Sequence, residues 1–165
     1  MKIKHFLFAI LIGFVFITAC SDDVIVIDTP KADYSIIGKW KLVALVDIEN
    51  NTSRPPDLDF PDGDIFTLLF DTIIQNDMHN CGIEMMGYYV SGVSSNNTQN
   101  GIYQVDYITN KLTTCIGTTK AGEISADGNL YYDIFIGGNE FSFELNANEL
   151  RLFYTPNNYL LFSRR

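Results

Sequence analysis

The chain has 165 residues, with 20 Asp and Glu against 11 Lys and Arg and a formal net charge of −9 at pH 7. An acidic surface repels phosphate groups, so nucleic acid is excluded as an expected partner. The length fits a short leader followed by one domain. With 12 Phe, 9 Tyr and 1 Trp, the chain can bury a sizeable core, which excludes global disorder.

Residues 1–19 have the parts of a secretory signal peptide: a lysine-containing start, an apolar run over 6–17 and small residues at the end. The apolar run is shorter than the roughly 18 residues of a membrane-spanning helix. The order Ile17-Thr18-Ala19-Cys20 resembles the lipobox of bacterial lipoproteins. That resemblance implies cleavage before Cys20 and a lipid on its thiol and new amino group. An uncleaved anchor or a buried helix is the alternative.

A lipid on Cys20 would make the membrane a partner and would place the protein in the cell envelope of a Gram-negative bacterium, at the outer membrane. Residues 20–34 then form an acidic tether. Its start, Ser21-Asp22-Asp23, resembles a surface-export signal of some lipoproteins, and a solvated spacer is the alternative. The next residues, Val24-Ile25-Val26-Ile27, predict an extra edge strand or an aggregation-prone segment.

Alternating apolar and polar residues predict that 35–165 form one mostly β domain, a small antiparallel barrel or meander. The first strand should place Trp40, Leu42, Ala44 and Val46 inside and Lys39 and Lys41 outside. Residues 49–64 are expected to form a polar loop, and 71–82 show no clear pattern. Predicted strands cover 36–46, 65–70, 85–93, 102–107, 111–117, 141–145, 150–154 and 159–162.

One short helix is expected at about 126–136. Leu130, Tyr131, Ile134 and Phe135 recur with helical spacing. Either Ser125 or Asp127 could cap the helix, and Gly137-Gly138 would end it. The alternation of Tyr132, Ile134 and Ile136 leaves a strand as the alternative.

Several motifs, taken in order over about residues 36–164, resemble the META domain of HslJ-like proteins. The resemblance implies a small mostly β fold with one helix and no enzymatic activity. The chain departs from the family pattern at Ser95, where the family often has Cys, and over 71–86. The matching motifs are Gly38-Lys39-Trp40-Lys41-Leu42, Ser91-Gly92, Asn96-Asn97, Gly101-Ile102-Tyr103, Leu112-Thr113, Thr118-Thr119-Lys120, Asn148-Glu149-Leu150-Arg151-Leu152 and Leu161-Phe162-Ser163-Arg164.

The chain also resembles the lipocalin family, through Gly38 and Trp40 near the start and Arg164 or Arg165 near the end. In that barrel an arginine packs on the tryptophan at the closed end, a cation–π contact. The resemblance implies a cup for a small apolar ligand. A strand that contains Trp40 by chance is the alternative.

The sequence around Cys81 and Cys115 favours a structural role for these cysteines over a catalytic one. In an oxidising envelope, Cys81 and Cys115 are expected to form a disulfide, with two buried free thiols as the alternative. Neither cysteine lies in a recognisable nucleophile motif. A catalytic triad would have to use His79, but the sequence has no Gly-x-Ser-x-Gly motif to supply its serine. We therefore expect no enzymatic activity, no catalytic residue and no cofactor.

Metal binding has two weak candidates in the sequence. His79, Cys81 and Cys115 do not have a standard zinc spacing. The acids between Asp57 and Asp64 suggest calcium, but Pro61 and Gly63 depart from the EF-hand pattern. A solvated acidic loop is the preferred interpretation, so we expect no metal.

The main functional hypothesis is a lipid-anchored, non-enzymatic META-like envelope protein with a binding, structural or stress role. A lipocalin-like carrier of a small apolar ligand is the alternative, and an envelope hydrolase using His79 is a second alternative. A protein partner is also possible. The barrel interior distinguishes the META-like hypothesis from the lipocalin-like one, because a carrier needs an open cavity of roughly 300 Å³ or more. A META-like barrel should instead be filled by Phe66, Phe70, Tyr103, Phe141, Phe143 and Leu152.

Overall fold

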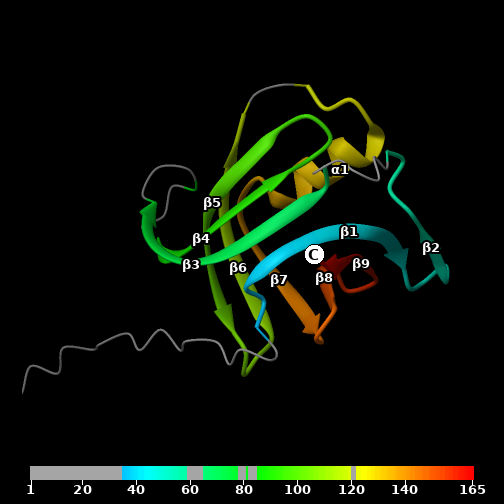
Figure 1. The fold of residues 1–165 in the computed structure, drawn as a ribbon. Coiled ribbons are helices and arrows are strands. Elements are labelled where there is room, and N and C mark those ends of the chain that lie inside the picture. The colour runs from blue at the N-terminus through cyan, green and yellow to red at the C-terminus, as the bar shows by residue number, and fades with distance from the viewer. Residues whose placement is uncertain (1–34, 59–64, 78–80, 82–84, 120–121) are drawn as a thin grey trace, which may run out of the picture.

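The computed structural model describes residues 35–58, 65–77, 81, 85–119 and 122–165. In this part of the chain the strands form one antiparallel sheet in the order β2-β1-β3-β4-β5-β6-β7-β8-β9, and β1 also pairs with β9. Eight strands, β1 and β3 to β9, therefore close into a barrel, with β2 added to the end of β1 (Figure 1). The strands are β1 (Gly38–Asp47), β2 (Thr52–Arg54), β3 (Thr67–Asp77), β4 (Met85–Val93), β5 (Thr98–Asp106), β6 (Lys111–Thr118), β7 (Gly137–Leu145), β8 (Glu149–Thr155) and β9 (Asn158–Arg164).

The predicted fold class is confirmed: the protein is a mostly β antiparallel barrel with a single short helix in the described residues. Each predicted strand overlaps an observed strand, and β4 has the predicted bounds. From β3 to β9 the order in the sheet follows the order in the sequence, because consecutive strands pair with each other. Closing β1 onto β9 removes the exposed edges that an open meander would leave.

Two stretches whose sequences lack the alternation typical of a strand nevertheless pair with neighbouring strands. The predicted loop at 49–64 contains β2, whose three residues are all exposed and which folds back on β1. Asn51, at φ 50°, lies in the turn between them. The unassigned residues 71–77 extend β3, with a register shift between Phe70 and Ile74. In both cases backbone pairing forms the strand, and the exposed side chains of 52–54 and 72–75 give no alternation that would mark it in the sequence.

A β-bulge changes the inner face of β1. The register with β9 shifts between Leu42 and Ala44, which inserts one residue. Leu45 is consequently in the core at 8% exposure, whereas Val46 is only partly buried. The predicted inward position of Val46 is therefore wrong. Lys41, predicted to point away from Trp40 and Leu42, is only 4% exposed and lies beside Thr67 of β3 and Ser163 of β9.

The barrel interior is filled by the side chains expected to fill it. All six predicted residues are at most 3% exposed and belong to one continuous apolar cluster. The Phe70 and Tyr103 rings meet edge-on with centroids 4.9 Å apart. The Tyr103 hydroxyl donates a hydrogen bond to the Asp71 carbonyl oxygen at 2.9 Å, which satisfies the one polar group of this ring.

The helix α1 (Ala126–Phe135) lies at the expected place, and the strand alternative is wrong. Ser125 is the N-cap, and its hydroxyl oxygen accepts from the Gly128 N–H at 2.9 Å. Gly137, at φ +86°, follows the last residues and turns the chain into β7. Within the described residues, no helix has the length and apolar character needed to cross a bilayer.

Candidate functional site

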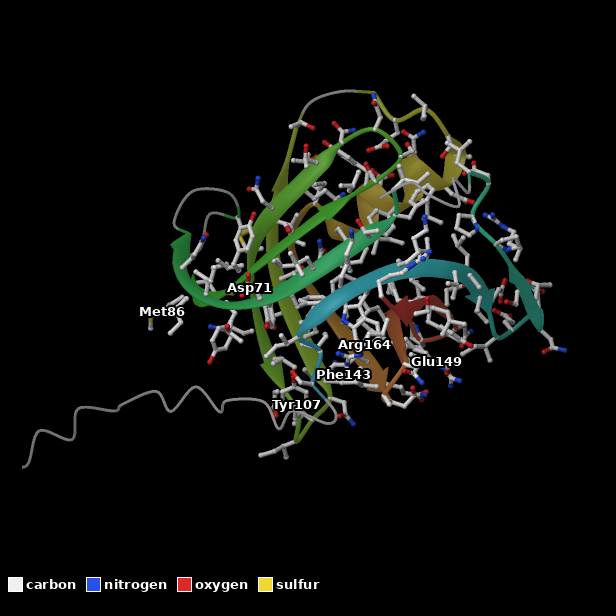
Figure 2. All side chains as sticks on the ribbon, viewed as in Figure 1. Asp71, Met86, Tyr107, Phe143, Glu149 and Arg164 are labelled. Atoms are coloured by element: carbon white, nitrogen blue, oxygen red, sulfur yellow. A yellow bond between two sulfur atoms is a disulfide. The ribbon has the colours of Figure 1, made fainter. Side chains whose placement is uncertain are left out.

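One end of the barrel is closed by an arginine on a tryptophan. Trp40 is fully buried, and the Arg164 guanidinium carbon lies 4.4 Å from its ring centroid. Arg164 also donates to the carbonyl oxygens of Ser35 at 2.7 Å, Ile37 at 2.9 Å and Ala147 at 2.9 Å. One side chain thus joins the start of the domain, the β7–β8 turn and the last strand. Figure 2 shows Arg164 at this end of the barrel, away from α1.

Gly38 is part of the same closure. Its φ is +126°, a backbone conformation that side-chain-bearing residues rarely adopt. A Cβ added there would lie 3.3 Å from Arg164 Nη1. The Trp40 indole N–H donates to the Ile36 carbonyl oxygen at 2.6 Å. The structure therefore brings together Gly38, Trp40 and Arg164, the three residues that the lipocalin resemblance singles out.

The other end of the barrel is closed by α1. Tyr131 and Phe135 are at most 1% exposed, and their ring centroids are 4.7 Å apart. The Tyr131 ring also meets Phe66 edge-on at 5.6 Å. Its hydroxyl donates to the Thr67 carbonyl oxygen at 3.1 Å, and burial raises the pKa of Tyr131 well above its ordinary value. The helix is thus a plug that fills its end of the barrel with aromatic rings.

A buried carboxylate anchors this plug. Asp127 on α1 is 3% exposed and accepts two hydrogen bonds from the Arg54 guanidinium, at 2.6 and 2.5 Å. It also accepts from the Asp57 N–H at 2.7 Å, while its own N–H donates to the Asp57 carboxylate at 3.1 Å. The hydrogen bonds from Arg54 lower the pKa of Asp127, against the opposing effect of burial.

A second carboxylate holds the β4–β5 turn against the chain before α1. Glu123 accepts from the hydroxyls of Ser94 and Ser95, and from the Asn97 amide at 2.6 Å. Burial alone would raise the pKa of Glu123, but these hydrogen bonds together lower it. Because its acceptor sites are used internally, Glu123 is a structural group in this geometry.

Acid is therefore expected to weaken the protein at the α1 end. A carboxylate whose folded-state pKa is lowered contributes stability above its unfolded pKa of about 4, and the contribution is lost as pH falls through the folded value. The free energy of unfolding, followed by urea titration from pH 7 to pH 3, should fall below pH 4. Asp127→Asn should show a smaller fall, with the remainder due to the other carboxylates whose pKa values hydrogen bonds lower, Glu123, Asp47 and Asp106. Asp133→Asn, on an exposed position of α1, should retain the full fall; equal curves for both variants would contradict this role of Asp127.

The two cysteines of the domain meet outside the barrel. Cys81 and Cys115 form a disulfide with Cα atoms 5.7 Å apart. Cys115 and Ile102 are fully buried and cluster with Met85, which is 9% exposed, and Cys81 packs against this small cluster. The cluster lies on the face of β5 opposite Tyr103, so the barrel wall is covered on both sides here. The sequence marked Ile102 as part of a strand but did not show that its outer face is buried.

Two polar side chains on the inner wall have no hydrogen-bond partner among the described residues. They are Gln99 on β5, through both amide atoms, and Thr114 on β6, through its hydroxyl. Each is 1% exposed. Buried polar groups are normally paired. Gln99 and Thr114 therefore place unpaired polar atoms on an inner wall that is otherwise mainly apolar.

A groove of about 570 Å³ lies on the outside of the barrel over β7. Its floor is the outer face of β7, with Glu140, Ser142 and Glu144, which alternate with buried Phe141 and Phe143. One wall is the β5–β6 turn around Asn110, and the other is the end of β8 from Phe153 to Pro156.

Charges in the groove are largely paired. Lys111 bonds Glu140 at 2.9 Å, and Arg151 of β8 bonds Glu144 at 2.9 Å. The Ser142 hydroxyl is exposed between them. The arrangement offers hydroxyl, carboxylate and aromatic surface together, without a nucleophile paired to a base.

Other candidate residues of the sequence lie outside the described residues: Cys20, His79 and the acids at 59, 62 and 64. Asp57 is described and bonds Asp127. Within the described residues, no cluster of His, Cys, Asp or Glu is arranged to hold a metal ion. Sequence reasoning missed Arg54 and Glu123, because their partners are distant along the chain.

No protein-family model and no curated protein sequence matches the chain. Two solved structures resemble it. One is a lipocalin-like protein from Bacteroides uniformis, with 14% identity, a TM-score of 0.47, and coverage of 78% of this chain and 97% of that chain. The other is a DUF4847 family protein from Bacteroides vulgatus, with 16% identity, a TM-score of 0.44, and coverage of 78% and 92%. The META resemblance has no counterpart in these two structures. Both scores are below 0.5, so neither likeness bears on the function of this chain.

Proposed function

We propose that this chain is a lipid-anchored, non-enzymatic binding protein of the cell envelope, with a lipocalin-like barrel that binds its ligand on the outer surface. The observation that carries the proposal is the combination of a filled interior with a groove of about 570 Å³ over β7. That volume lies within the range of small-molecule sites. The Arg164–Trp40 closure supports the lipocalin-like interpretation of the barrel.

The groove suits a neutral, hydroxyl-rich molecule such as a saccharide. Phe153 offers an aromatic face to C–H groups, and the Ser142 hydroxyl can both donate and accept. Glu140 and Glu144 can accept from ligand hydroxyls. Each of the two carboxylates is paired with a cation, Glu140 with Lys111 and Glu144 with Arg151, so the groove has no excess positive charge to attract an anionic ligand.

Filling the groove should abolish binding without unfolding the barrel. Ser142 is exposed and lies opposite Phe153 on β8, so Ser142→Trp adds a ring where the ligand would sit. We expect saturation-transfer NMR with a panel of neutral oligosaccharides to detect binding to the natural chain, and a loss of at least about tenfold in affinity for the variant, or 1.4 kcal/mol. Asn100→Trp, on an exposed position of β5, is the matched control. Equal binding by both variants would contradict the groove as the site.

Lipid attachment at Cys20 is supported by the lipobox resemblance and by the tether that separates Cys20 from the domain. Cys20→Ser should move the protein from the membrane fraction to the soluble fraction, because the acidic domain has no attraction for anionic lipid. Far-UV circular dichroism should be unchanged. Ser21→Ala is the matched control and should stay with the membrane. Retention of the Cys20→Ser variant in the outer membrane would contradict the anchor.

Carriage of a small apolar ligand inside the barrel is the second candidate. It is favoured by the partnerless polar atoms of Gln99 and Thr114 on the inner wall, which a ligand with one polar group could satisfy. Entry would require α1 to leave its end of the barrel, since Tyr131 and Phe135 fill it. This candidate therefore predicts a ligand-induced displacement of α1, which the outer groove does not.

A further inference from the structure

Within the described residues, the second half of β3 has an open strand edge on the side of β1. β3 pairs with β1 only from Thr67 to Phe70, whereas its pairing with β4 resumes at Ile74 and continues to Asp77. On the β1 side, the described residues provide no strand opposite the part of β3 after Phe70. Among the described residues, hydrogen bonds lie at the beginning of this part, where the Tyr103 hydroxyl donates to the Asp71 carbonyl oxygen and the Thr72 N–H donates to the Asp71 carboxylate. The backbone from Ile73 onward can accept another strand.

The same place exposes apolar side chains. Ile73 is 54% exposed, Ile74 55% and Met86 44%. We call these three residues the hairpin patch; Figure 2 shows Met86 on the β3–β4 hairpin, away from the closed end marked by Arg164. An open edge next to exposed isoleucines is a combination that β proteins normally cover.

We propose that the tether segment Val24–Ile27 docks on this edge as an added strand and covers the hairpin patch. The segment is four consecutive β-branched apolar residues, the type that fits a strand and gains most from burial. It is the most apolar stretch of the otherwise polar residues 20–34. The occupant therefore lies in the same chain, and its effective concentration at the edge is set by a short linker.

The linker is long enough. The eight residue steps from Ile27 to Ser35 span at most about 29 Å. Ser35 lies three steps before Gly38, or at most about 11 Å, and Gly38 pairs directly with Phe70. From Phe70 to Ile73 is about 10 Å along the strand. The path from Ser35 to the open edge is therefore within reach of the segment.

Docking would set the distance between barrel and membrane. With Val24–Ile27 on β3, only three residues separate Cys20 from the barrel, whereas the free tether of 15 residues could extend to about 50 Å. This consequence rests on the proposed lipid at Cys20, but the docking itself does not.

Hydrogen exchange on the full chain, read by mass spectrometry in detergent, tests the proposal. We expect amides of 24–27 and 73–77 to exchange at least about tenfold more slowly than those of 29–34. Ile73→Asp should release 24–27, and Ile25→Asp with Ile27→Asp should release those amides of 73–77 that do not bond β4. The matched control, Thr29→Asp with Ala32→Asp, adds the same charge to the tether and should leave the protection intact.

Three results would overturn the docking. The first is exchange of 24–27 at the rate of 29–34. The second is protection that survives Ile73→Asp, which would assign it to the micelle. The third is protection of 73–77 that rises with protein concentration and survives the tether substitutions, which would assign the edge to a second copy. None of these depends on whether the groove over β7 binds a ligand.

Discussion

Trp40→Ala is expected to lower the free energy of unfolding by about 3–5 kcal/mol. The side chain is fully buried and its indole N–H bonds the Ile36 carbonyl oxygen. Its removal leaves a cavity at the closed end and frees the guanidinium that packs on it. Arg164→Ala should lower the free energy of unfolding by less, about 1–3 kcal/mol, because two of its bonds to carbonyl oxygens are only partly buried and the third, to Ala147, is exposed. Urea unfolding followed by tyrosine fluorescence measures both.

A double-mutant cycle separates the ring contact from the rest of the closure. The variant that carries both Trp40→Ala and Arg164→Ala should lose less free energy of unfolding than the two single variants lose together. The expected difference is about 0.5–2 kcal/mol. Arg165→Ala, at the exposed neighbouring position, is the control and should stay within about 0.5 kcal/mol of the natural chain. Strict additivity would show that the contact between Arg164 and Trp40 contributes nothing.

Loss of the disulfide is the second large expected effect. Cys81 and Cys115 are 34 residues apart in sequence. Breaking a disulfide that closes a loop of that size should lower the free energy of unfolding by about 2–4 kcal/mol. The loss also uncovers Ile102 and Met85, which pack around Cys115. Urea unfolding with and without reductant should therefore give clearly different midpoints.

The variant with Cys81→Ala and Cys115→Ala is the control for that measurement. It should unfold at the midpoint of the reduced natural chain, and reductant should not shift it further. An unchanged midpoint for the reduced natural chain would contradict a stabilising bond between β6 and the segment that carries Cys81.

The barrel was predictable because most strands have one buried face, so that alternation reports them directly. Phe141 and Phe143 on β7 are clear examples, as is the helical spacing of Tyr131 and Phe135. The strand over 71–77 was not predictable, since residues 72–75 are all exposed and the segment pairs with β4 through its backbone. The bulge beside Val43 could not be predicted either, because one inserted residue leaves the local composition unchanged.

The candidate site was less predictable than the barrel. Gly38, Trp40 and Arg164 are recognisable because a family resemblance links the two ends of the chain, which the closing pair β1–β9 then brings together. Nothing in the sequence links Arg54 to Asp127, which are 73 residues apart, or Glu123 to Ser94. The groove over β7 likewise depends on how far the β5–β6 turn and the end of β8 rise above the sheet.

Methyl NMR during titration with a neutral oligosaccharide and, separately, with a fatty acid tests the central claim most directly. The inward-facing methyl groups of Val90, Leu112 and Leu152 report on the filled interior, and backbone amides of Ser142 and Phe153 report on the groove. The filled barrel with an outer site predicts saturable shifts at Ser142 and Phe153 with the oligosaccharide and none at the three methyl groups with either ligand. One-to-one binding of the fatty acid that shifts Val90, Leu112 and Leu152 and displaces α1 would contradict it and would establish the barrel as a carrier.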